Sequence, residues 1–207
     1  MIRRTAQCGA LTVNDAGREV AVAGWVHRWR DHGGVVFIDL RDRSGIVQIV
    51  FRPENDADLH ARSHKLRSEY VIAVRGQVDK RSPETVNPNL PTGEIELVVT
   101  EMELLNTAAN LPYPVHDPLE DQNELNRLRF RYLDLRTEWM QDRLAARHKV
   151  TRTIRRVLDE HGFWEVETPV LSKSTPEGAR DFLVPSRLHP TEFYALPQSP
   201  QLYKQLL

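Results

Sequence analysis

Hydrophobic residues alternate with polar ones in short runs through the first half of the chain, and each run stops at a turn signal. The runs are rich in Val and Ile, which favours strands. Residues 56–69 instead repeat their apolar positions every three to four residues, which favours a short helix. Turn residues such as Gly33 and Gly34, and a polar stretch at 80–93, separate the runs. The pattern predicts five strands with a helix after the third: Val20–Val26, Val35–Leu40, Ile46–Phe51, Val71–Val78 and Glu94–Leu105.

This order of elements is typical of an OB-fold barrel, an all-β domain that binds oligonucleotides on one face. The predicted strands carry side chains that suit single-stranded nucleic acid: Arg30 and His32 near the first turn, the ring of Phe37 and the amide of Gln48. The alternative is that the aromatic residues belong to the core and that the charged residues 39–43 form a solvated turn. The pattern alone leaves both interpretations open.

The second half changes in character after a proline-rich linker at Ala108–Pro118, where we place a domain boundary. Basic and apolar residues then interleave at 123–136, which suits either a surface that faces RNA or a docking element with solvated arginines. Residues Trp139–His161 carry an apolar stripe at helical spacing, and Gly162 stands where a left-handed residue commonly ends a helix. Residues 163–171 alternate like a strand, which Pro169 within them restricts to an edge or an interface.

Two polar segments near the end of the chain have the composition of a ligand site. A polar loop at 174–178 has Glu177 at its tip, in the manner of a lid that closes over a pocket. Further on, Ser199 is a good helix N-cap, which places Gln201 and Lys204 at a helix start that favours negative charge. Taken singly, each of these residues is more often an ordinary surface residue.

Composition sets limits on this picture. Lys and Arg number 28 against 29 Asp and Glu, for a formal net charge of −1, so a nucleic acid has to meet a local basic patch. The single cysteine, Cys8, excludes an internal disulfide and suits a reducing compartment. The sequence shows no apolar leader or membrane-spanning run, so we expect a cytoplasmic protein without membrane contact. Because the last helix stops after barely two turns at Leu207, we expect the sequence to be part of a longer protein.

Several strings of residues resemble a known family. STPEGARDFLVPSR and FYALPQSPQLYKQLL resemble the start of the catalytic domain of bacterial aspartyl-tRNA synthetases. RFRYLDLR and GFWEVETPVL resemble the hinge and the first motif of class II synthetases, and GWVHRWRDHGGVVFIDLRDRSGIVQIVF resembles their anticodon-binding OB domain. The resemblance implies an α+β protein in three parts: an OB-fold domain at 1–107, a hinge at 108–138, and the start of an antiparallel-sheet catalytic domain at 139–207.

The resemblance also implies roles for single residues in the second half. Glu177 resembles the flipping-loop glutamate that contacts the amino group of the substrate. Ser199, Gln201 and Lys204 resemble the segment that binds L-aspartate, with Lys204 meeting the side-chain carboxylate. Pro169 matches the proline that lies at the dimer interface in the first motif.

In the OB domain the resemblance concerns the anticodon. Phe37 resembles the aromatic residue that stacks on an anticodon base, and Arg30, Gln48 and Glu96 resemble polar readers of the anticodon. His32 stands where enzymes restricted to one tRNA tend to have leucine. It therefore resembles the relaxed type of enzyme, which also charges tRNA(Asn) with aspartate.

The family reaction activates L-aspartate with ATP and Mg²⁺ and transfers it to tRNA(Asp). The resemblance therefore implies an aspartate–tRNA ligase that forms homodimers, with tRNA(Asn) as a further partner on the strength of His32. The family binds ATP through later motifs that lie beyond Leu207, so we expect no catalytic residue, no ATP site and no metal site in these residues, and no activity from them alone. The alternative is a stand-alone OB-fold protein that binds tRNA without chemistry.

Overall fold

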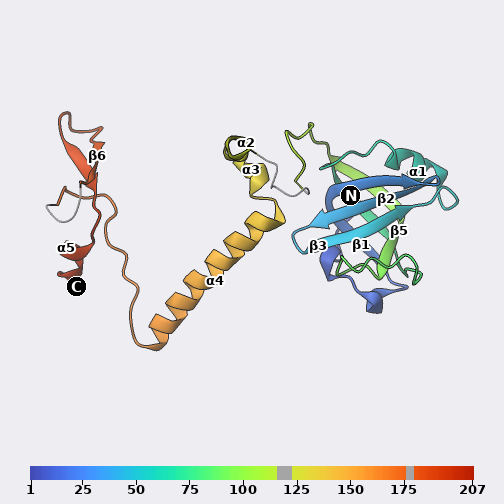
Figure 1. The fold of residues 1–207 in the computed structure, drawn as a ribbon, viewed down its shortest axis with the longest axis horizontal. Coiled ribbons are helices and arrows are strands. Elements are labelled where there is room, and N and C mark those ends of the chain that lie inside the picture. Colours follow the sequence, from blue (N-terminus) through green and yellow to red (C-terminus); the bar gives the residue numbers. More distant parts are fainter. Residues whose placement is uncertain (116–122, 176–179) are drawn as a thin grey trace. The chain divides into compact units, whose positions relative to one another are not determined.

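The computed structural model describes residues 1–115, 123–175 and 180–207. The chain forms two compact units, Met1–Leu133 and Asp134–Leu207 (Figure 1). The division into three parts, at 1–107, 108–138 and 139–207, differs from these two units and remains a prediction.

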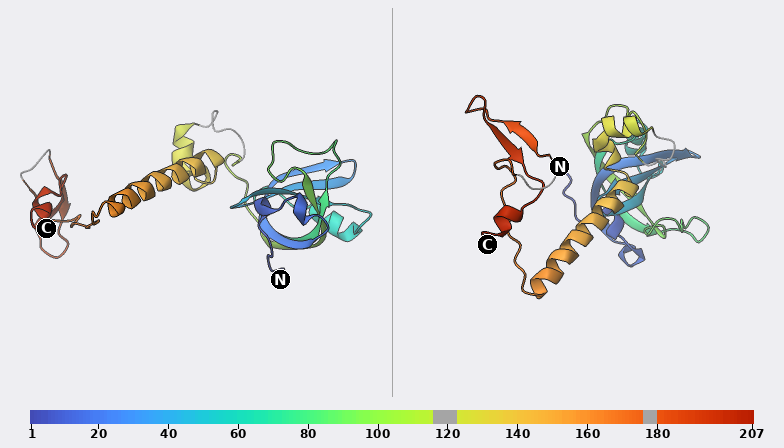
Figure 2. Two further views of the ribbon diagram at one scale, coloured as in Figure 1. Left: turned by 90° about the horizontal axis from the view of Figure 1, so that it is seen from below. Right: turned by 60° about the vertical axis from the view of Figure 1, so that its left-hand side comes forward.

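The first unit contains a closed five-stranded barrel with a helix between the third and fourth strands, which confirms the predicted OB-type arrangement (Figure 2). The strands follow the order β1-β2-β3-β5-β4, in which β3 and β5 pair in parallel and the other neighbours pair antiparallel. The helix is shorter than predicted. The elements are the 3₁₀ helices η1 (Cys8–Ala10) and η2 (Val13–Asp15), then β1 (Glu19–His32), β2 (Val35–Asp42), β3 (Gly45–Phe51), α1 (Ala57–Ser63), β4 (Val71–Lys80) and β5 (Ile95–Asn106).

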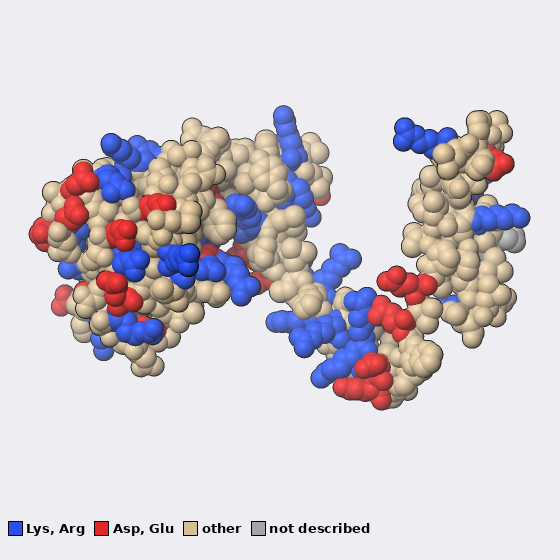
Figure 3. All heavy atoms as spheres, turned by 180° about the vertical axis from the view of Figure 1, so that it is seen from behind, with Lys and Arg blue, Asp and Glu red and all other residues tan. Residues whose placement is uncertain are grey.

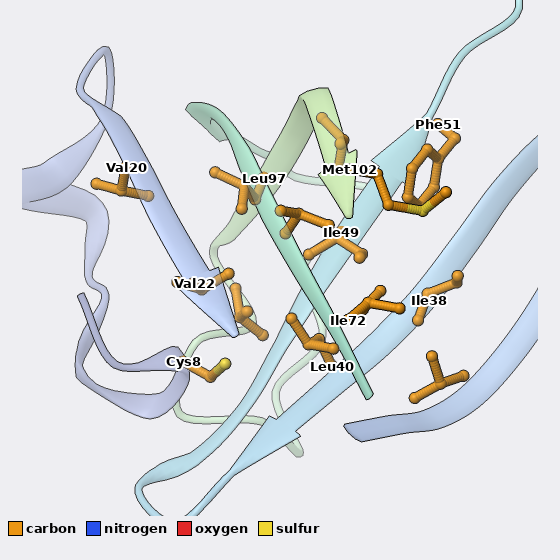
Figure 4. Close-up of a cluster of buried hydrophobic side chains, with 14 of the residues drawn as sticks. Cys8, Val20, Val22, Ile38, Leu40, Ile49, Phe51, Ile72, Leu97 and Met102 are labelled. Carbon is orange, nitrogen blue, oxygen red and sulfur yellow. The ribbon is translucent and has the colours of Figure 1, made fainter. Parts of the chain in front are cut away.

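Apolar side chains from all five strands fill the barrel interior (Figure 4). Val36, Ile38 and Leu40 of β2 are fully buried, because alternate residues of a strand point to the same side. Cys8 of η1 belongs to the same core. Burial, with the nearby Asp42 carboxylate, raises the pKa of its thiol. Cys8 is therefore a small apolar core residue here and not a reactive thiol.

A charged cluster lies at a bend in β1. The pairing of β1 with β2 shifts at His27, which makes this residue the extra one of a β-bulge. Arg41 of β2 has its Nη1 2.8 Å from Nδ1 of His27, and its Nη2 donates to both carboxylate oxygens of Glu69 at 2.9 and 2.8 Å. Glu69 is buried with a left-handed φ of 63°, and its N–H donates to the carbonyl of Val26 at 2.7 Å. The bulge sets which side of the strand Arg30 faces, because a shift of one residue exchanges the two faces.

A small second cluster lies beyond β5 in the same unit. Tyr113, Val115 and Leu133 are buried there, and Phe130 packs against them. The hydroxyl of Tyr113 donates to the carbonyl of Phe130 at 3.3 Å. The described part of the predicted linker therefore packs against Phe130, the C-cap of α2 (Glu124–Arg129), and against Leu133 of α3 (Arg131–Asp134).

The second unit starts with the long predicted helix. Thr137 caps it by accepting the N–H of Met140 at 3.4 Å. Gly162, at φ 80°, ends it, and the N–H of Phe163 donates back to the carbonyl of Leu158 at 3.0 Å. Lys and Arg side chains gather along this helix, with acidic residues near its C-terminal end (Figure 3). The elements are α4 (Glu138–Glu160), the antiparallel hairpin of β6 (Phe182–Pro185) and β7 (Phe193–Leu196), and α5 (Gln201–Lys204).

The strand predicted at 163–171 is wrong for this structure. Residues 163–169 have no regular structure, and the nearest pairing is a single bridge between Ser172 and Ala195. Alternation provides two faces, but a strand also needs a neighbouring backbone to pair with, and none of the described residues pairs with this segment. Apart from the buried Met140, the apolar stripe of α4 is exposed as well, with 45% exposure at Leu144 and 55% at Ile154.

Candidate functional site

One side of the barrel carries an open hollow of about 650 Å³, called the barrel groove from here on. Residues of all five strands line it, together with the turn between β4 and β5. Its lining contains the five residues that the sequence singled out in this domain, Arg30, His32, Phe37, Gln48 and Glu96, and also Arg52 and Arg81, which the sequence did not single out. The fold therefore brings the predicted residues of this domain together in one place.

Strand pairing explains why these side chains meet. Phe37 of β2 pairs with Arg30 of β1, and Asp39 of β2 pairs with Gln48 of β3. The residues that flank Phe37 point into the core, so Phe37 and Asp39 face outward. Phe37 is half-buried and lies outside the core cluster. The alternative that it is a core residue is therefore not supported by its position.

A chain of hydrogen bonds crosses the groove. Nη2 of Arg30 lies 2.6 Å from Oδ1 of the buried Asp39 and 3.4 Å from Oε1 of Gln48. Nε2 of Gln48 donates to Oε2 of Glu96 at 3.4 Å, and Nη2 of Arg52 donates to Oε1 of Glu96 at 2.9 Å. The amide of Gln48 is thus oriented, with its oxygen toward Arg30 and its nitrogen toward Glu96. An oriented amide between a cation and a carboxylate is suited to reading the edge of a base.

Arg81 lies in the wall of the groove and is only 7% exposed. Its Nε donates to the carbonyl of Ile95 at 2.9 Å and lies 4.0 Å from Oε2 of Glu96, and its Nη1 donates to the carbonyl of Thr85 at 3.3 Å. Its Nη2 is buried without a hydrogen-bond partner among the described residues. Burial lowers the pKa of Arg81, and the carboxylates of Glu96 and Asp39 oppose that shift. An arginine stays charged in this situation.

The position of Arg81 in the sequence was the one signal that could have pointed to it. It directly follows the fourth strand and starts the long polar turn, where a surface charge is the ordinary interpretation. Its burial arises from the pairing of β4 with β5, which joins Lys80 to Ile95 and brings Arg81 beside Glu96. That pairing links residues far apart in the sequence, so local pattern does not reveal it.

The candidate residues near the end of the chain lie in and beside α5. The hydroxyl of Ser199 accepts the N–H of Gln201 at 3.2 Å, although the helix N-cap is Pro200, one residue later than predicted. Gln201 and Lys204 are exposed. Because α5 is a single turn, any affinity for a carboxylate rests on Lys204 itself more than on the helix dipole.

Three hydrogen bonds involve residues next to the segment 176–179. Oδ2 of Asp181 accepts the hydroxyl of Ser174 at 2.9 Å and the N–H of Thr175 at 3.0 Å. The side chain of Gln198 donates to the carbonyl of Arg180 at 3.4 Å, which ties the segment before α5 to the residue after 176–179. Glu177, the predicted lid residue, lies outside the described residues.

The second unit also contains a larger hollow, of about 940 Å³, along α4 and residues 163–165. It contains none of the residues predicted to bind aspartate, so its size does not mark it as the amino-acid site. Pro169 is exposed in the irregular segment that follows. Within the described ranges, no group of three or more His, Cys, Asp or Glu is arranged to hold a metal ion. Among the described helices, none combines the length and apolar character needed to cross a membrane.

Comparison with known proteins supports both halves of this description. The family of class II tRNA synthetases of the D, K and N types matches residues 123–207, and the family of OB-fold nucleic acid binding domains matches residues 20–105. A relative from Moorella thermoacetica, named aspartate–tRNA(Asp/Asn) ligase, is 58% identical over 206 residues, which is all of this chain and 34% of the relative. The chain matches aspartyl-tRNA synthetases of class II along its whole length. A relative of the same name from Endomicrobium trichonymphae is 56% identical and is covered to 35%.

Solved structures of class II synthetases show the same fold as this chain. The asparaginyl-tRNA synthetase of Pyrococcus horikoshii, in complex with asparaginyl-adenylate, superposes with a TM-score of 0.84 at 26% identity, over the whole chain and 45% of that protein. A structure described as a putative aspartyl-tRNA synthetase from Leishmania major shows the same fold, with a TM-score of 0.80 at 24% identity, over 94% of this chain and 38% of that one. The chain spans about a third of the length of the curated relatives it matches.

Proposed function

We propose that the protein is an aspartate–tRNA ligase, which activates L-aspartate with ATP to aspartyl-adenylate and transfers the aspartyl group to tRNA(Asp). The observation that carries this proposal is the gathering of Arg30, Phe37, Gln48 and Glu96 in the barrel groove of a chain from this family. Reading the anticodon is the step in which this groove takes part.

The groove offers the three kinds of contact that single-stranded RNA needs. The half-buried ring of Phe37 gives a stacking platform, and the oriented amide of Gln48 gives a hydrogen-bonding edge. Arg30, held by Asp39, supplies a positioned cation beside them. The lining of the groove also contains His32, so we include tRNA(Asn) among the proposed partners, as in the names of the relatives.

We place the amino-acid site at the end of the chain, with Ser199, Gln201 and Lys204 on one side and Glu177 on the other. The bond between Gln198 and Arg180 supports this arrangement, because it links the segment before α5 to the residue that follows 176–179. A lysine ammonium is the natural partner of the side-chain carboxylate of aspartate. Homodimer formation near Pro169 and a cytoplasmic location are part of the same proposal.

ATP and Mg²⁺ belong to the proposed reaction as well. The described residues have no acidic cluster suited to a metal ion, and they do not fit a magnesium site. We therefore assign no step through ATP or Mg²⁺ to these residues. What this part of the protein contributes is the recognition of tRNA and of aspartate.

The anticodon role can be tested by replacing Phe37 with alanine. The loss of one stacked base should weaken binding of the anticodon stem-loop of tRNA(Asp) by about 1–3 kcal/mol. Binding is measured by fluorescence anisotropy with the 207-residue chain. Trp164→Ala is the matched control, since Trp164 is an aromatic residue that is 89% exposed and lies outside the barrel. Equal affinities of Phe37→Ala and the unmodified chain would remove Phe37 from the RNA site.

The aspartate role can be tested at Lys204 in a protein with the full length of the curated relatives. Lys204→Met should raise the KM for aspartate by about 100-fold or more, because a charge-assisted bond to a carboxylate is lost. Pyrophosphate exchange measures the effect, with Lys173→Met as the control for a nearby lysine. A normal KM for aspartate in Lys204→Met would exclude this carboxylate contact. Charging of purified tRNA(Asn) by the unmodified enzyme tests the second tRNA.

A further inference from the structure

We propose that Trp29 is a positioning residue of the barrel groove. It fixes the outer half of β1, residues 27–32, on the end of α1 and thereby holds Arg30 in place for the anticodon loop of a tRNA. This inference rests on the proposed function, since it takes that RNA as the ligand. Trp29 is not among the residues that line the groove, so its effect on binding passes through its neighbour on the strand.

The outer half of β1 has a strand neighbour on one side only. The pairing of β1 with β4 covers Glu19–Trp25 and ends there, because β4 begins at Val71, the partner of Trp25. Beyond that point β1 pairs with β2 alone among the described strands. A strand with one neighbour has fewer ladder hydrogen bonds to hold it and separates from its sheet more readily than a central strand. The position of Arg30 therefore depends on what else holds this edge.

The segment between α1 and β4 takes the place of the missing strand. Its N–H of Glu69 donates to the carbonyl of Val26, just before the outer half, at 2.7 Å. Further out, Nε1 of Trp29 donates to the carbonyl of Ser63, the last residue of α1, at 3.1 Å. The indole ring also packs edge-to-face with the ring of His64, with 5.7 Å between the centroids. Trp29 thus ties the unpaired edge of β1 to α1.

The end of α1 is itself fixed to the barrel. Leu59 and Leu66, on either side of it, belong to the barrel core. Nη2 of Arg62 donates to the carbonyl of Met102 in β5 at 2.9 Å, and Ser63 is fully buried. The acceptor of the indole N–H is therefore a backbone atom held by the core. A hydrogen bond to such an atom transmits the position of the barrel to β1.

Strand register explains why Trp29 acts on Arg30 and does not meet the RNA itself. Trp29 pairs with the fully buried Ile38, and Arg30 pairs with Phe37 of the groove. Opposite residues of an antiparallel pair share a side, and consecutive residues alternate. Trp29 therefore faces the barrel side, with its N–H already used, while Arg30 faces the groove. Nη2 of Arg30 reaches Gln48 only at 3.4 Å, so a small displacement of the strand at Trp29 breaks that contact.

Two substitutions at Trp29 measure the effect on RNA binding. In the 207-residue chain, Trp29→Ala should weaken binding of the anticodon stem-loop of tRNA(Asp) by about tenfold, because both the hydrogen bond and the ring contact are lost. Trp29→Phe keeps a ring beside His64 and loses the N–H, so the loss should be about threefold. Unchanged affinity in Trp29→Ala would overturn the proposal. If Trp29→Ala folds poorly, Trp29→Phe is judged by the same criteria.

A core substitution in the same strand is the matched control. Val22 is fully buried in the first half of β1, so Val22→Ala should lower the free energy of unfolding, measured with urea. It should bind the stem-loop normally under conditions in which it is folded, because the outer half of β1 is unchanged. A loss of affinity in Val22→Ala as large as that in Trp29→Ala would reduce the role of Trp29 to general stability and overturn the proposal.

A double-mutant cycle tests whether Trp29 acts through Arg30. Arg30→Gln removes the guanidinium and keeps a donor for the buried Asp39. In the Arg30→Gln background, Trp29→Ala should change the affinity by no more than about twofold, because the group that it positions is already absent. The same fold-loss in both backgrounds would mean that Trp29 contacts the RNA itself, and this would overturn the proposal.

Amide hydrogen exchange gives a measurement without RNA. Trp29→Ala should speed the exchange of residues 27–32 by about tenfold and leave that of β4 and β5 unchanged, since only the outer half of β1 loses its tie. Unchanged exchange at 27–32 would overturn the proposal. Failure of the proposed function gives a different result: the unmodified chain would bind the stem-loop of tRNA(Asp) no better than one of scrambled loop sequence. That outcome would overturn the inference together with the function, whatever the exchange shows.

Discussion

Asp42 shows how a single side chain holds the end of the barrel together. Its Oδ2 accepts the N–H of Cys8 at 2.9 Å, and its Oδ1 accepts the N–H of Ser44 at 2.7 Å and the hydroxyl of Ser44 at 2.5 Å. Burial raises the pKa of Asp42, but these hydrogen bonds outweigh burial, so the pKa lies below its ordinary value. The ionised carboxylate therefore joins η1 to the turn between β2 and β3.

This arrangement predicts a pH dependence of folding. Because the pKa of Asp42 is lower in the folded chain than in the unfolded one, its stabilisation is present above about pH 4 and is lost as the pH falls through the folded value. Asp42→Asn should lower the free energy of unfolding at pH 7 by about 2 kcal/mol and make the acid-side decline shallower. Urea unfolding at several pH values measures both effects. Glu54→Gln, at an exposed position, is the control. If the free energy of unfolding of Asp42→Asn fell with decreasing pH as steeply as that of the unmodified chain, Asp42 would not be the source of the pH dependence.

The residues of the barrel groove also show which functional side chains can be predicted from the sequence and which cannot. Phe37 and Gln48 could be singled out because an outward aromatic residue and an amide between apolar neighbours stand out in a strand pattern. Asp39 and Arg81 look like ordinary surface charges in the sequence, yet both are buried. Their roles come from partners on other strands, which a local pattern does not contain.

At the scale of elements, the bulge in β1 depends on Arg41. Arg41→Met removes two bonds to the buried carboxylate of Glu69, so we expect the free energy of unfolding to fall by about 3 kcal/mol. The bulge also determines which side of β1 Arg30 faces. We therefore expect Arg41→Met to bind the anticodon stem-loop more weakly, even under conditions in which the variant is fully folded. Urea unfolding and fluorescence anisotropy measure the two effects.

A core variant provides the control for Arg41→Met. Ile72→Ala removes a fully buried side chain and costs a similar free energy, about 2–5 kcal/mol, but it leaves the bulge and its charged cluster unchanged. It should bind the stem-loop normally under conditions in which it is folded. Equal binding by both variants would show that Arg41 acts on stability alone.

The elements differ in how well alternation predicted them. Four of the barrel strands were predicted closely, because each has a buried face and a neighbour within the chain. The exception is β1, which was predicted to end at Val26 and continues to His32, because its outer half pairs with β2 although it lacks an apolar run. Residues 163–171 have the same alternation and form no strand, because no neighbour among the described residues pairs with them. The helix α4 was predicted from its stripe, and yet that stripe is exposed, so periodicity identified the helix without identifying what covers it.

At the scale of the whole molecule, the unit Met1–Leu133 has its own cores, the barrel interior and the cluster around Tyr113. We therefore expect residues 1–133 to fold alone and to bind the anticodon stem-loop with the affinity of the 207-residue chain, within about twofold. Thermal unfolding and anisotropy on the two chains measure this. A loss of tenfold or more in the shorter chain would assign part of the RNA contact to residues 134–207.

The strand order of the barrel has a consequence for its synthesis. β5 is the last strand of the barrel in the sequence, yet it lies between β3 and β4 in space. On the ribosome, β1, β2 and β3 are made first, and the edge of β3, with its apolar run at 46–51, stays unpaired until residue 106 has emerged. Such an edge readily pairs with other chains. The interval between translation of β3 and of β5 is thus the period in which the nascent protein most needs protection by a chaperone.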